Sequence, residues 1–375
     1  NARNSGVEMN RYYVVPPDVA MFIFYNCKNI TMEDASLVES SFWTLHMVRC
    51  QEVLIQNMFI YSSLEQGVNA DGIDINSCQD VTIKNCKITA GDDAIAIKTR
   101  YEDPCESIRV SNCVLTSSST ALKLGTESFG DFRDIRFENC QVLNSNRGLS
   151  IVVRNGGTVE DVVFSNISIE CKRRHCNWWG NGEPIWIYLT KKHPTKSKVG
   201  LIKNVVFENI SATGMGTSKL ESTEGVRIQD IRFFNVNLEM QQEDYADKRA
   251  DHAFYASNVK GLIMNNCNID WNDQHTEEKW GSALYISDCS GVDILNFRGR
   301  QGLEDSESPA VILSNTSNVN IQNYVADPST KMVVKVSGSE SSDIKIQGIQ
   351  ELSDVQKALS VDTDVINKAS IQYIR

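Results

Sequence analysis

A short apolar segment recurs along the chain at nearly constant spacing, and this repeat constrains the fold more than any other feature. A segment of the type Val/Ile-x-Val/Ile/Phe-x-Asn begins at Val53, and its equivalents follow at intervals of 28, 27, 27, 27, 43, 26, 31, 30, 27 and 25 residues. These equivalents begin at Val81, Ile108, Ile135, Val162, Val205, Ile231, Leu262, Val292, Val319 and Ile344. Self-similarity at a period of about 20–50 residues is typical of solenoids, propellers and other arrays.

The composition of each repeat predicts strands rather than helices. Apolar and polar residues alternate, and Val and Ile are abundant. A second alternating segment precedes most repeats, as in 72–76, 94–98 and 121–125. A four-stranded propeller blade needs about 40–45 residues, and a crossover helix would not fit between such closely spaced strands. The sequence therefore predicts an all-β fold, a single-stranded right-handed parallel β-helix that forms a solenoid of about 12 coils.

The repeat extends over nearly the whole chain, so we expect a single β-helix domain over residues 1–375. Solenoids need capping at their terminal repeats. Residues 1–11 are polar and lack the repeat pattern. We therefore expect the N-terminal cap to be missing or truncated in this sequence.

The cysteines occupy repeat positions rather than the spacings of a disulfide or metal site. Of the eleven cysteines, Cys27, Cys86, Cys113, Cys140 and Cys267 directly follow an asparagine at the same repeat position. Equivalent positions predict a buried stack of thiols inside the solenoid. Because no Cys/His spacing fits a zinc site, we predict neither a metal nor a cofactor.

Three aspartates predict the chemistry. Asp71 lies in Asn-Ala-Asp-Gly-Ile-Asp, and Asp92 and Asp93 lie in Gly-Asp-Asp-Ala-Ile-Ala-Ile, each just before an alternating segment. Asp93 follows Asp71 by 22 residues, so we expect them on adjacent coils about 4.8 Å apart. Carboxylates this close cannot all ionise cheaply, which leaves a general acid beside a general base, as glycosidic cleavage requires. The alternative is that these aspartates only cap corners of the solenoid.

Further polar and aromatic residues are expected on the same wall. Alternation predicts two columns of outward side chains, which are Asp74, Ala96, Lys123, Ser150 and Trp186 in one and Asn76, Lys98, Gly125, Val152 and Tyr188 in the other. Lys98 and Lys123 are therefore outward residues, and Arg154 lies close by, so these three could bind a carboxylate or sugar hydroxyls. The alternative is a solvated basic surface. The 43-residue interval contains Trp178, Trp179 and Glu183. Aromatic rings beside carboxylates suit stacking on sugar faces, and the alternative is a lid over apolar surface.

The two aspartate segments resemble motifs of glycoside hydrolase family 28, which contains the polygalacturonases and rhamnogalacturonan hydrolases. Residues 69–74 resemble its Asn-Thr-Asp-Gly motif, residues 91–98 its Asp-Asp motif, and residues 42–46 its Phe-Trp-x-x-His segment. The resemblance is to a divergent, bacterial-type member. It implies an inverting mechanism in which Asp92 is the general acid and Asp71 and Asp93 activate water. Asn69, the first motif residue, is counted with the substrate-binding residues.

Two motifs of that family are changed in this chain. Thr120 stands where the family has its catalytic-site histidine, and Ser150-Ile151-Val152 stands where it has Arg-Ile-Lys, which grips a galacturonate carboxylate. The sequence therefore favours a rhamnogalacturonan-like or side-chain linkage over homogalacturonan. Stacked carboxyls about 5 Å apart usually indicate retention, and inverting pairs stand about 6.5–9.5 Å apart; we follow the resemblance and predict inversion.

The overall prediction is an inverting glycoside hydrolase that cleaves pectin-type polysaccharide of plant cell walls. The alternatives are a polysaccharide lyase or epimerase on the same scaffold and a non-catalytic glycan-binding β-helix. The expected partner is a polysaccharide or oligosaccharide. The net charge of −11 argues against nucleic acid, and no apolar run is long enough to span a bilayer. We expect a monomer that is secreted or periplasmic, although this chain carries no signal peptide.

Overall fold

The computed structural model describes residues 19–374 except 175–178, 194, 224, 226–227, 305 and 351–356. The described residues are almost all in short β-strands and the turns between them, and they form two compact units, 1–201 and 202–375. Among these residues, no helix has the length and apolar character needed to cross a membrane.

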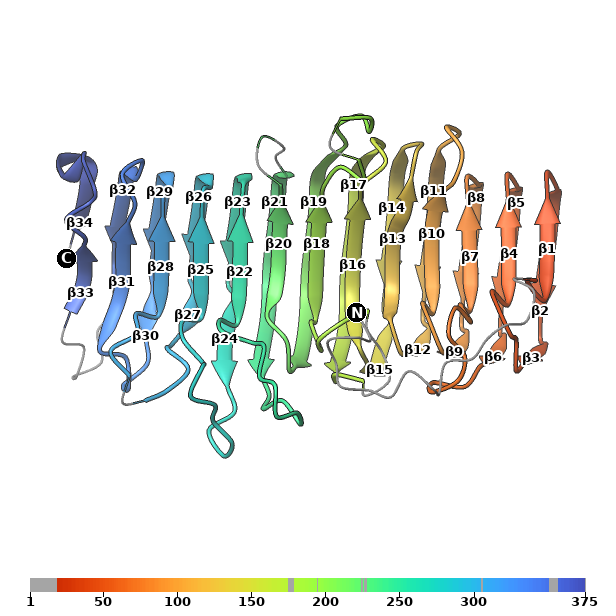
Figure 1. Cartoon of the computed structure of the whole chain (residues 1–375), viewed down its shortest axis with the longest axis horizontal. Helices are drawn as coiled ribbons and strands as arrows, with labels where there is room; N and C mark the ends of the chain where they lie inside the picture. The colour runs from red at the N-terminus through yellow and green to blue at the C-terminus, as the bar shows by residue number, and fades with distance from the viewer. Residues whose placement is uncertain are drawn as a thin grey trace. The chain divides into compact units, whose positions relative to one another are not determined.

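In the first unit, one parallel sheet contains one strand from each coil. Each strand pairs in parallel with the corresponding strand of the next coil, as Figure 1 shows for the row of strands labelled β4 to β16. The strands are β1 (Phe22–Tyr25), β4 (Leu45–Val48), β7 (Ile73–Asn76), β10 (Ile95–Thr99), β13 (Thr120–Ser128), β16 (Arg147–Val153) and β18 (Ile185–Leu189).

The recurring sequence segment forms the second set of strands in this unit. These strands are β2 (Lys28–Glu33), β5 (Gln51–Gln56), β8 (Gln79–Lys84), β11 (Cys105–Ser111), β14 (Phe132–Glu138) and β17 (Thr158–Cys171). Short strands continue each coil: β3 (Ser36–Val38), β6 (Phe59–Tyr61), β9 (Lys87–Ala90), β12 (Val114–Ser117) and β15 (Gln141–Ser145). The asparagine that ends the repeat turns the chain between them; at Asn85 and Asn112 φ is 56° and 54°, a left-handed conformation that asparagine tolerates well.

The second unit is built in the same way. Its first sheet contains β20 (Ser218–Ser222), β22 (Phe254–Ser257), β25 (Leu284–Ser287), β28 (Val311–Ser314), β31 (Met332–Ser337) and β33 (Lys357–Val361). The other strands are β19 (Leu201–Gly214), β21 (Ile228–Met240), β23 (Val259–Asn265), β24 (Asn268–Trp271), β26 (Ser290–Leu295), β27 (Arg298–Gly299), β29 (Ser317–Gln322), β30 (Val325–Ala326), β32 (Ser342–Gln347) and β34 (Ile371–Ile374), with a 3₁₀ turn at Lys368–Ser370.

Across the described residues the first sheets contain seven and six strands in the two units. One strand per coil gives about 13 coils, close to the dozen predicted. The predicted fold class, a right-handed parallel β-helix, is therefore confirmed.

Side chains of one kind stack along the inside of each unit because successive coils are in register. The rings of Phe137 and Phe164 are parallel within 8°, with centroids 4.8 Å apart, and Phe207 and Phe233 repeat this arrangement in the second unit. The described cysteines form no disulfide, and all of them except Cys27 are buried. The predicted burial of the repeat thiols is thus confirmed for Cys86, Cys113, Cys140 and Cys267 and is wrong for Cys27.

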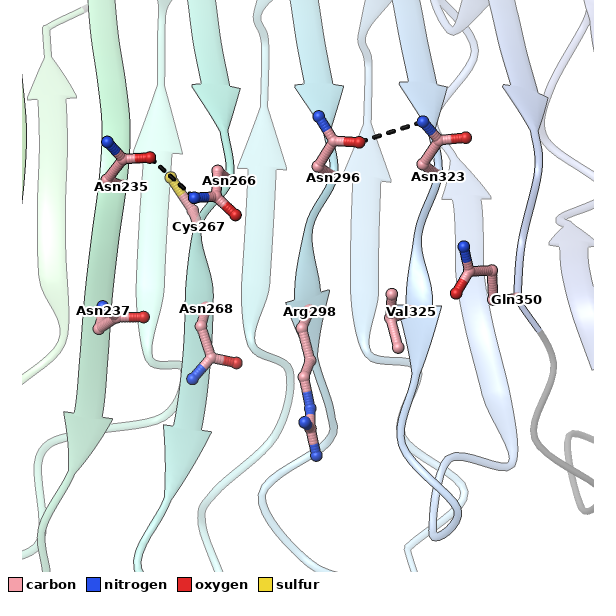
Figure 2. Close-up of a pocket in the computed structure, with 10 residues that line it drawn as sticks. All are labelled: Asn235, Asn237, Asn266, Cys267, Asn268, Asn296, Arg298, Asn323, Val325 and Gln350. Carbon is pink, nitrogen blue, oxygen red and sulfur yellow. Dashed lines mark hydrogen bonds between the residues drawn. The ribbon is translucent and has the colours of Figure 1, made fainter.

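Asparagines stack on the outside of the second unit. The side-chain amide of Asn266 donates to Asn235 at 2.7 Å, and Asn323 donates to Asn296 at 3.1 Å (Figure 2). Each of these residues is exposed and has a positive φ. The asparagine of the repeat therefore serves twice, by turning the backbone and by linking neighbouring coils.

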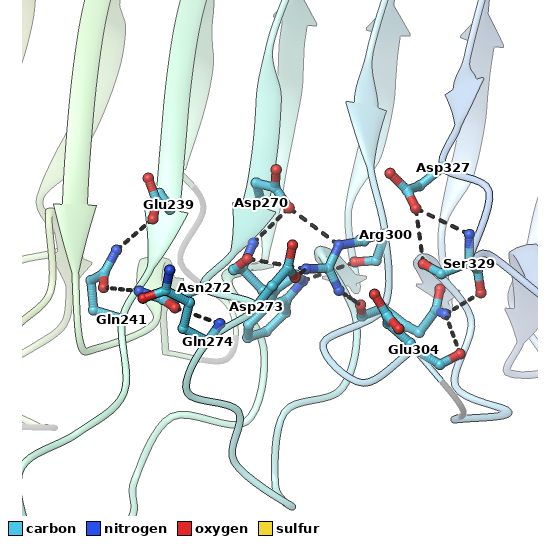
Figure 3. Close-up of polar contacts among 12 residues, drawn as sticks. Glu239, Gln241, Asp270, Asn272, Asp273, Gln274, Arg300, Glu304, Asp327 and Ser329 are labelled. Atoms are coloured by element: carbon cyan, nitrogen blue, oxygen red, sulfur yellow. Dashed lines mark hydrogen bonds and ion pairs between the residues drawn. The ribbon is translucent and has the colours of Figure 1, made fainter.

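The loops that follow β24 and β27 are linked through a buried arginine. Arg300 is 5% exposed and donates to the carbonyl oxygen of Trp271 at 3.0 Å and to Asp270 at 3.2 Å, and it also pairs with Asp273 (Figure 3). These contacts satisfy the buried guanidinium within one loop cluster, which gives it a structural role.

We predict that Phe137→Ala lowers the free energy of unfolding by about 3–5 kcal/mol, because it removes a fully buried ring from the stack and leaves a cavity. Equilibrium unfolding in urea measures the change. The matched control is Phe129→Ala, since Phe129 is 48% exposed and its loss should change stability by about 0.5 kcal/mol or less. Equal destabilisation by the two substitutions would contradict the proposed role of the stack.

Candidate active site

Strand register brings the predicted aspartates together. Ile73 of β7 pairs with Ile95 of β10, so Asp71 and Asp93, each two residues before its strand residue, occupy equivalent places on adjacent coils. The amide of Gly72 donates to the carbonyl oxygen of Asp93 at 2.9 Å. The predicted juxtaposition of the aspartate segments is therefore present in the structure.

One of the two predicted columns of outward side chains is confirmed, and the other is interrupted in the structure. The pairings of the first sheet place one column in order: Asp74, Ala96, Lys123, Ser150 and Trp186. The second predicted column is wrong between Lys98 and Gly125, because the register shifts after Ile97. Gly125 has a φ of 93°, and this left-handed backbone belongs to the irregular stretch that breaks the alternation.

Lys98 holds two of the carboxylates. Its Nζ lies 2.9 Å from Oδ2 of Asp71 and 2.8 Å from Oδ1 of Asp74, and all three side chains are buried. The ring of Trp43 covers the ammonium group at 4.0 Å. Burial, followed by the charge of Asp74, raises the pKa of Asp71, and burial raises the pKa of Asp74 to about 6. Lys98 was predicted to bind substrate, but its contacts place it among the aspartates.

Asp93 is bound by several donors that favour its ionised form. Lys123 Nζ lies 2.6 Å from one carboxylate oxygen, while Ser119 Oγ and the amide of Thr120 donate to the other at 2.8 and 3.2 Å. Burial opposes ionisation, but the charges of Lys123 and Lys98 outweigh it and hold the pKa of Asp93 below its ordinary value. Asp93 is thus suited to act as a base.

Asp92 differs from both neighbours. It is partly exposed, and its carboxyl group makes no ion pair with any described residue. Burial of the group, together with the negative charges of Asp71 and Asp93, raises its pKa well above the ordinary value. The pKa values of Asp71 and Asp92 are thus raised and that of Asp93 is lowered, so the cluster contains a proton donor next to an ionised base, as acid–base catalysis needs.

A cavity of about 530 Å³ adjoins these aspartates and shares Ser119 and Lys123 with Asp93. Five cationic and three aromatic side chains line it: Lys123, Arg147, Arg154, Lys191, Lys192, Trp179, Trp186 and Tyr188. Such a lining suits a ligand that carries negative charge and also presents apolar faces.

The other predicted substrate-binding residues are placed as follows. Lys123, Arg154 and Trp179 line the cavity. Glu183 is 2% exposed and is held by Arg147 through two hydrogen bonds of 3.1 and 3.2 Å, so it orients that arginine. Asn69 is exposed at a corner with a φ of 63°. Trp178 lies outside the described residues.

The sequence analysis missed several lining residues. Trp186 and Tyr188 are outward residues of β18, as the alternation of that strand predicted, but they were not assigned to substrate binding. Lys191 and Lys192 follow the strand in a loop with no periodic pattern, so no signal in the sequence placed them here.

A second cavity, of about 580 Å³, lies on the second unit (Figure 2). Its lining consists of amides, Cys267, Val325 and Arg298. Because no carboxylate lines it, it lacks the acid and base that the first site provides, and we do not consider it a candidate for glycosidic cleavage.

Carboxyl groups with separated pKa values on the outer wall of a parallel β-helix define a candidate carbohydrate-cleaving site. Comparison with known proteins agrees with this class. Residues 15–257 match the sequence profile of Glycosyl hydrolases family 28. The chain therefore belongs to this family, as the motifs at 69–74 and 91–98 predicted.

Individual relatives are similar over limited segments. A probable polygalacturonase of Vitis vinifera is 32% identical over 75 residues, which is 20% of this chain and 15% of that protein. A polygalacturonase of Persea americana is 34% identical over 76 residues, again 20% of this chain and 16% of the relative. The family 28 exopolygalacturonase of Yersinia enterocolitica shares the fold, with a TM-score of 0.55 at 13% identity over 71% of this chain and 46% of that chain.

We predict that Lys123→Met moves both limbs of the pH profile of kcat/KM on a pectic substrate to higher pH. The acidic limb reports ionisation of the base and the alkaline limb loss of the acid's proton. Lys123 lowers the pKa of both Asp93 and Asp92, so its removal raises both values. Lys87→Met, which changes an exposed lysine of β9, is the control. An unchanged acidic limb in Lys123→Met would contradict the assignment of Asp93 as base.

Proposed function

We propose that this chain is an inverting glycoside hydrolase that cleaves pectin-type polysaccharide, in a secreted or periplasmic setting, and that it is a divergent, bacterial-type member of its family. The proposal is carried by one observation, the clustering of Asp71, Asp92 and Asp93 on adjacent coils with lysines paired to Asp71 and Asp93. A binding module or a scaffold would have no need to gather three carboxyls on adjacent coils and to neutralise only some of them.

The proposed reaction is a single displacement. Asp92 donates its proton to the glycosidic oxygen as the bond from that oxygen to the anomeric carbon breaks. Water attacks the anomeric carbon from the opposite face while Asp71 and Asp93 orient it, and its proton passes to Asp93, the ionised member of this pair. Asp71 Oδ1 is buried without a hydrogen-bond partner, so it offers an acceptor for this water. Proton exchange with solvent then restores the starting state.

Lys98 and Lys123 support this reaction by forming ion pairs with the carboxylates. Lys98 bridges Asp71 and Asp74, and Lys123 pairs with Asp93, so the water-activating pair is fixed in position and partly neutralised. Asp92 lacks such a cation and keeps the proton that it must donate. Two neighbouring aspartates, Asp92 and Asp93, are thereby given opposite roles by their surroundings.

The substrate preference that we propose is a rhamnogalacturonan-like or side-chain linkage rather than homogalacturonan. Where the family has its uronate-binding Arg-Ile-Lys, Ser150 and Val152 are 1% and 4% exposed and carry no charge. The absence of charge at these two positions supports a polymer in which an uncharged sugar lies beside the cleaved bond.

We expect Asp92→Asn to lower kcat by about 10²–10⁴-fold, the usual contribution of a general acid, with the thermal unfolding curve unchanged. Release of reducing ends from a panel of pectic polysaccharides measures the loss. Asp80→Asn is the matched control, because Asp80 is an exposed residue of β8. Full activity of Asp92→Asn would refute the proposed acid, and ultraviolet absorbance from unsaturated products would indicate a lyase instead.

The stereochemistry of the product gives a separate test. Proton NMR of the first-formed reducing sugar should show the anomer opposite to that of the cleaved linkage, because one displacement by water inverts the anomeric carbon. Initial formation of the same anomer would mean that one of the aspartates forms a covalent intermediate.

A further inference from the structure

The cavity on the second unit presents hydrogen-bonding groups that the fold does not use (Figure 2). The side chains of Asn237, Asn268 and Gln350 line it, and their amides form no hydrogen bond with any residue that the structure describes. Each of these amides carries N–H donors and a carbonyl acceptor side by side. The cavity therefore offers donors and acceptors together and suits a ligand that is rich in groups of both kinds.

Strand register arranges this lining in a row along the coil axis. Asn237 pairs with Asn268, and Asn268 pairs with Arg298. The row continues through the pairings of Arg298 with Val325 and of Val325 with Gln350. The row thus spans five coils, and four coil spacings amount to about 19 Å. Such a length suits an extended polymer that lies along the axis.

A second row in the same cavity is the asparagine ladder, and the ladder is interrupted there. Asn266 donates to Asn235 at 2.7 Å, and Asn323 donates to Asn296 at 3.1 Å. Asn296, however, donates to Asn265 at 3.0 Å instead of to Asn266. The carbonyl oxygen of the Asn266 side chain therefore accepts no hydrogen bond within the described part of the chain. Figure 2 shows this gap between the two hydrogen-bonded pairs.

The charges near the row disfavour an anionic ligand. Arg298 lies 3.5 Å from a carboxylate oxygen of Asp327, so the cation of the row already has a counter-charge. Three acidic residues each follow a residue of the row by two positions along the chain, which are Glu239, Asp270 and Asp327 (Figure 3). This acidic border repels polyanions, whereas carboxylate oxygens accept hydrogen bonds from hydroxyl groups.

We propose that this amide-lined cavity is a binding site for a neutral polysaccharide. A chain that lies along the axis meets an amide or a guanidinium on most coils, and neighbouring sugar hydroxyls match the donor and acceptor of one amide. Val325 and Cys267 are the apolar side chains of the lining, too few for the hydrophobic centre of a protein interface. The inference goes beyond the proposed function, because a lining without a carboxylate binds a polysaccharide but does not cleave it.

The test measures binding without turnover, in native gels that contain xyloglucan, linear galactan or polygalacturonate. Asp92→Asn protein is compared with a variant that also carries Asn237→Ala and Asn268→Ala. We expect this variant to bind at least one of the two neutral polymers about tenfold more weakly, because two amides lose their hydrogen bonds, while retardation by polygalacturonate changes little.

Asn166→Ala on the Asp92→Asn background is the matched control. Asn166 belongs to the ladder of the first unit, where it donates to Asn139 at 3.1 Å. Its loss should leave binding of the neutral polymers unchanged. Gln350→Ala gives the same test at the end of the row if the variant with two alanines does not fold.

The outcomes separate this inference from the proposed function. If neither neutral polymer retards the Asp92→Asn protein, or if the variants of the row bind as tightly as that protein, the polysaccharide site is overturned. An equal loss of affinity in Asn166→Ala would also overturn it, because the effect would not come from the cavity. Release of reducing ends from pectic polysaccharide by the wild-type chain would still support the proposed hydrolysis. If the predicted affinity losses are found but the wild-type chain cleaves no pectic polysaccharide, the binding site stands and the proposed hydrolysis fails.

Discussion

The hydrogen-bonded register between successive coils is the constraint on which the rest of the structure depends. It converts a distance of 22 residues in sequence into adjacent positions on one wall, and so brings Asp71 beside Asp93. The same register stacks Phe137 on Phe164 inside the first unit. A shift by one residue would exchange inward and outward side chains along a strand, so the core and the candidate site are specified by the same hydrogen bonds.

Stacking like charges in register carries an energetic cost, and two lysines determine how it is distributed. Lys98 lies between Asp71 and Asp74, while Lys123 pairs with Asp93 alone. Asp92 has no such partner, so burial and then the negative charges of Asp71 and Asp93 raise its pKa. The pKa values of the three carboxyls thus differ because the lysines are placed unevenly around them.

The fold could be predicted from the sequence because its signals are periodic. The spacing of the repeat predicted the number of coils, and the alternation of apolar and polar residues predicted the outward column from Asp74 to Trp186. Features without a period were not predictable. The break after Ile97 depends on an irregular backbone near Gly125. Likewise, alternation placed Lys98 on the outer wall, but whether it binds substrate or the carboxylates depends on its side-chain conformation and on the cover that Trp43 provides.

The separation of inward and outward positions also explains how such a chain can keep its aspartates while its substrate contacts differ. Inward residues such as Ile95 and Ile97 determine packing, whereas Lys123, Ser150 and Trp186 on the outer wall are replaceable without loss of the core. Each coil therefore supplies a nearly independent contact at intervals of about 4.8 Å. A substrate that lies along the axis meets a different set of outward residues on each coil, so selectivity follows from the order of these residues along one wall.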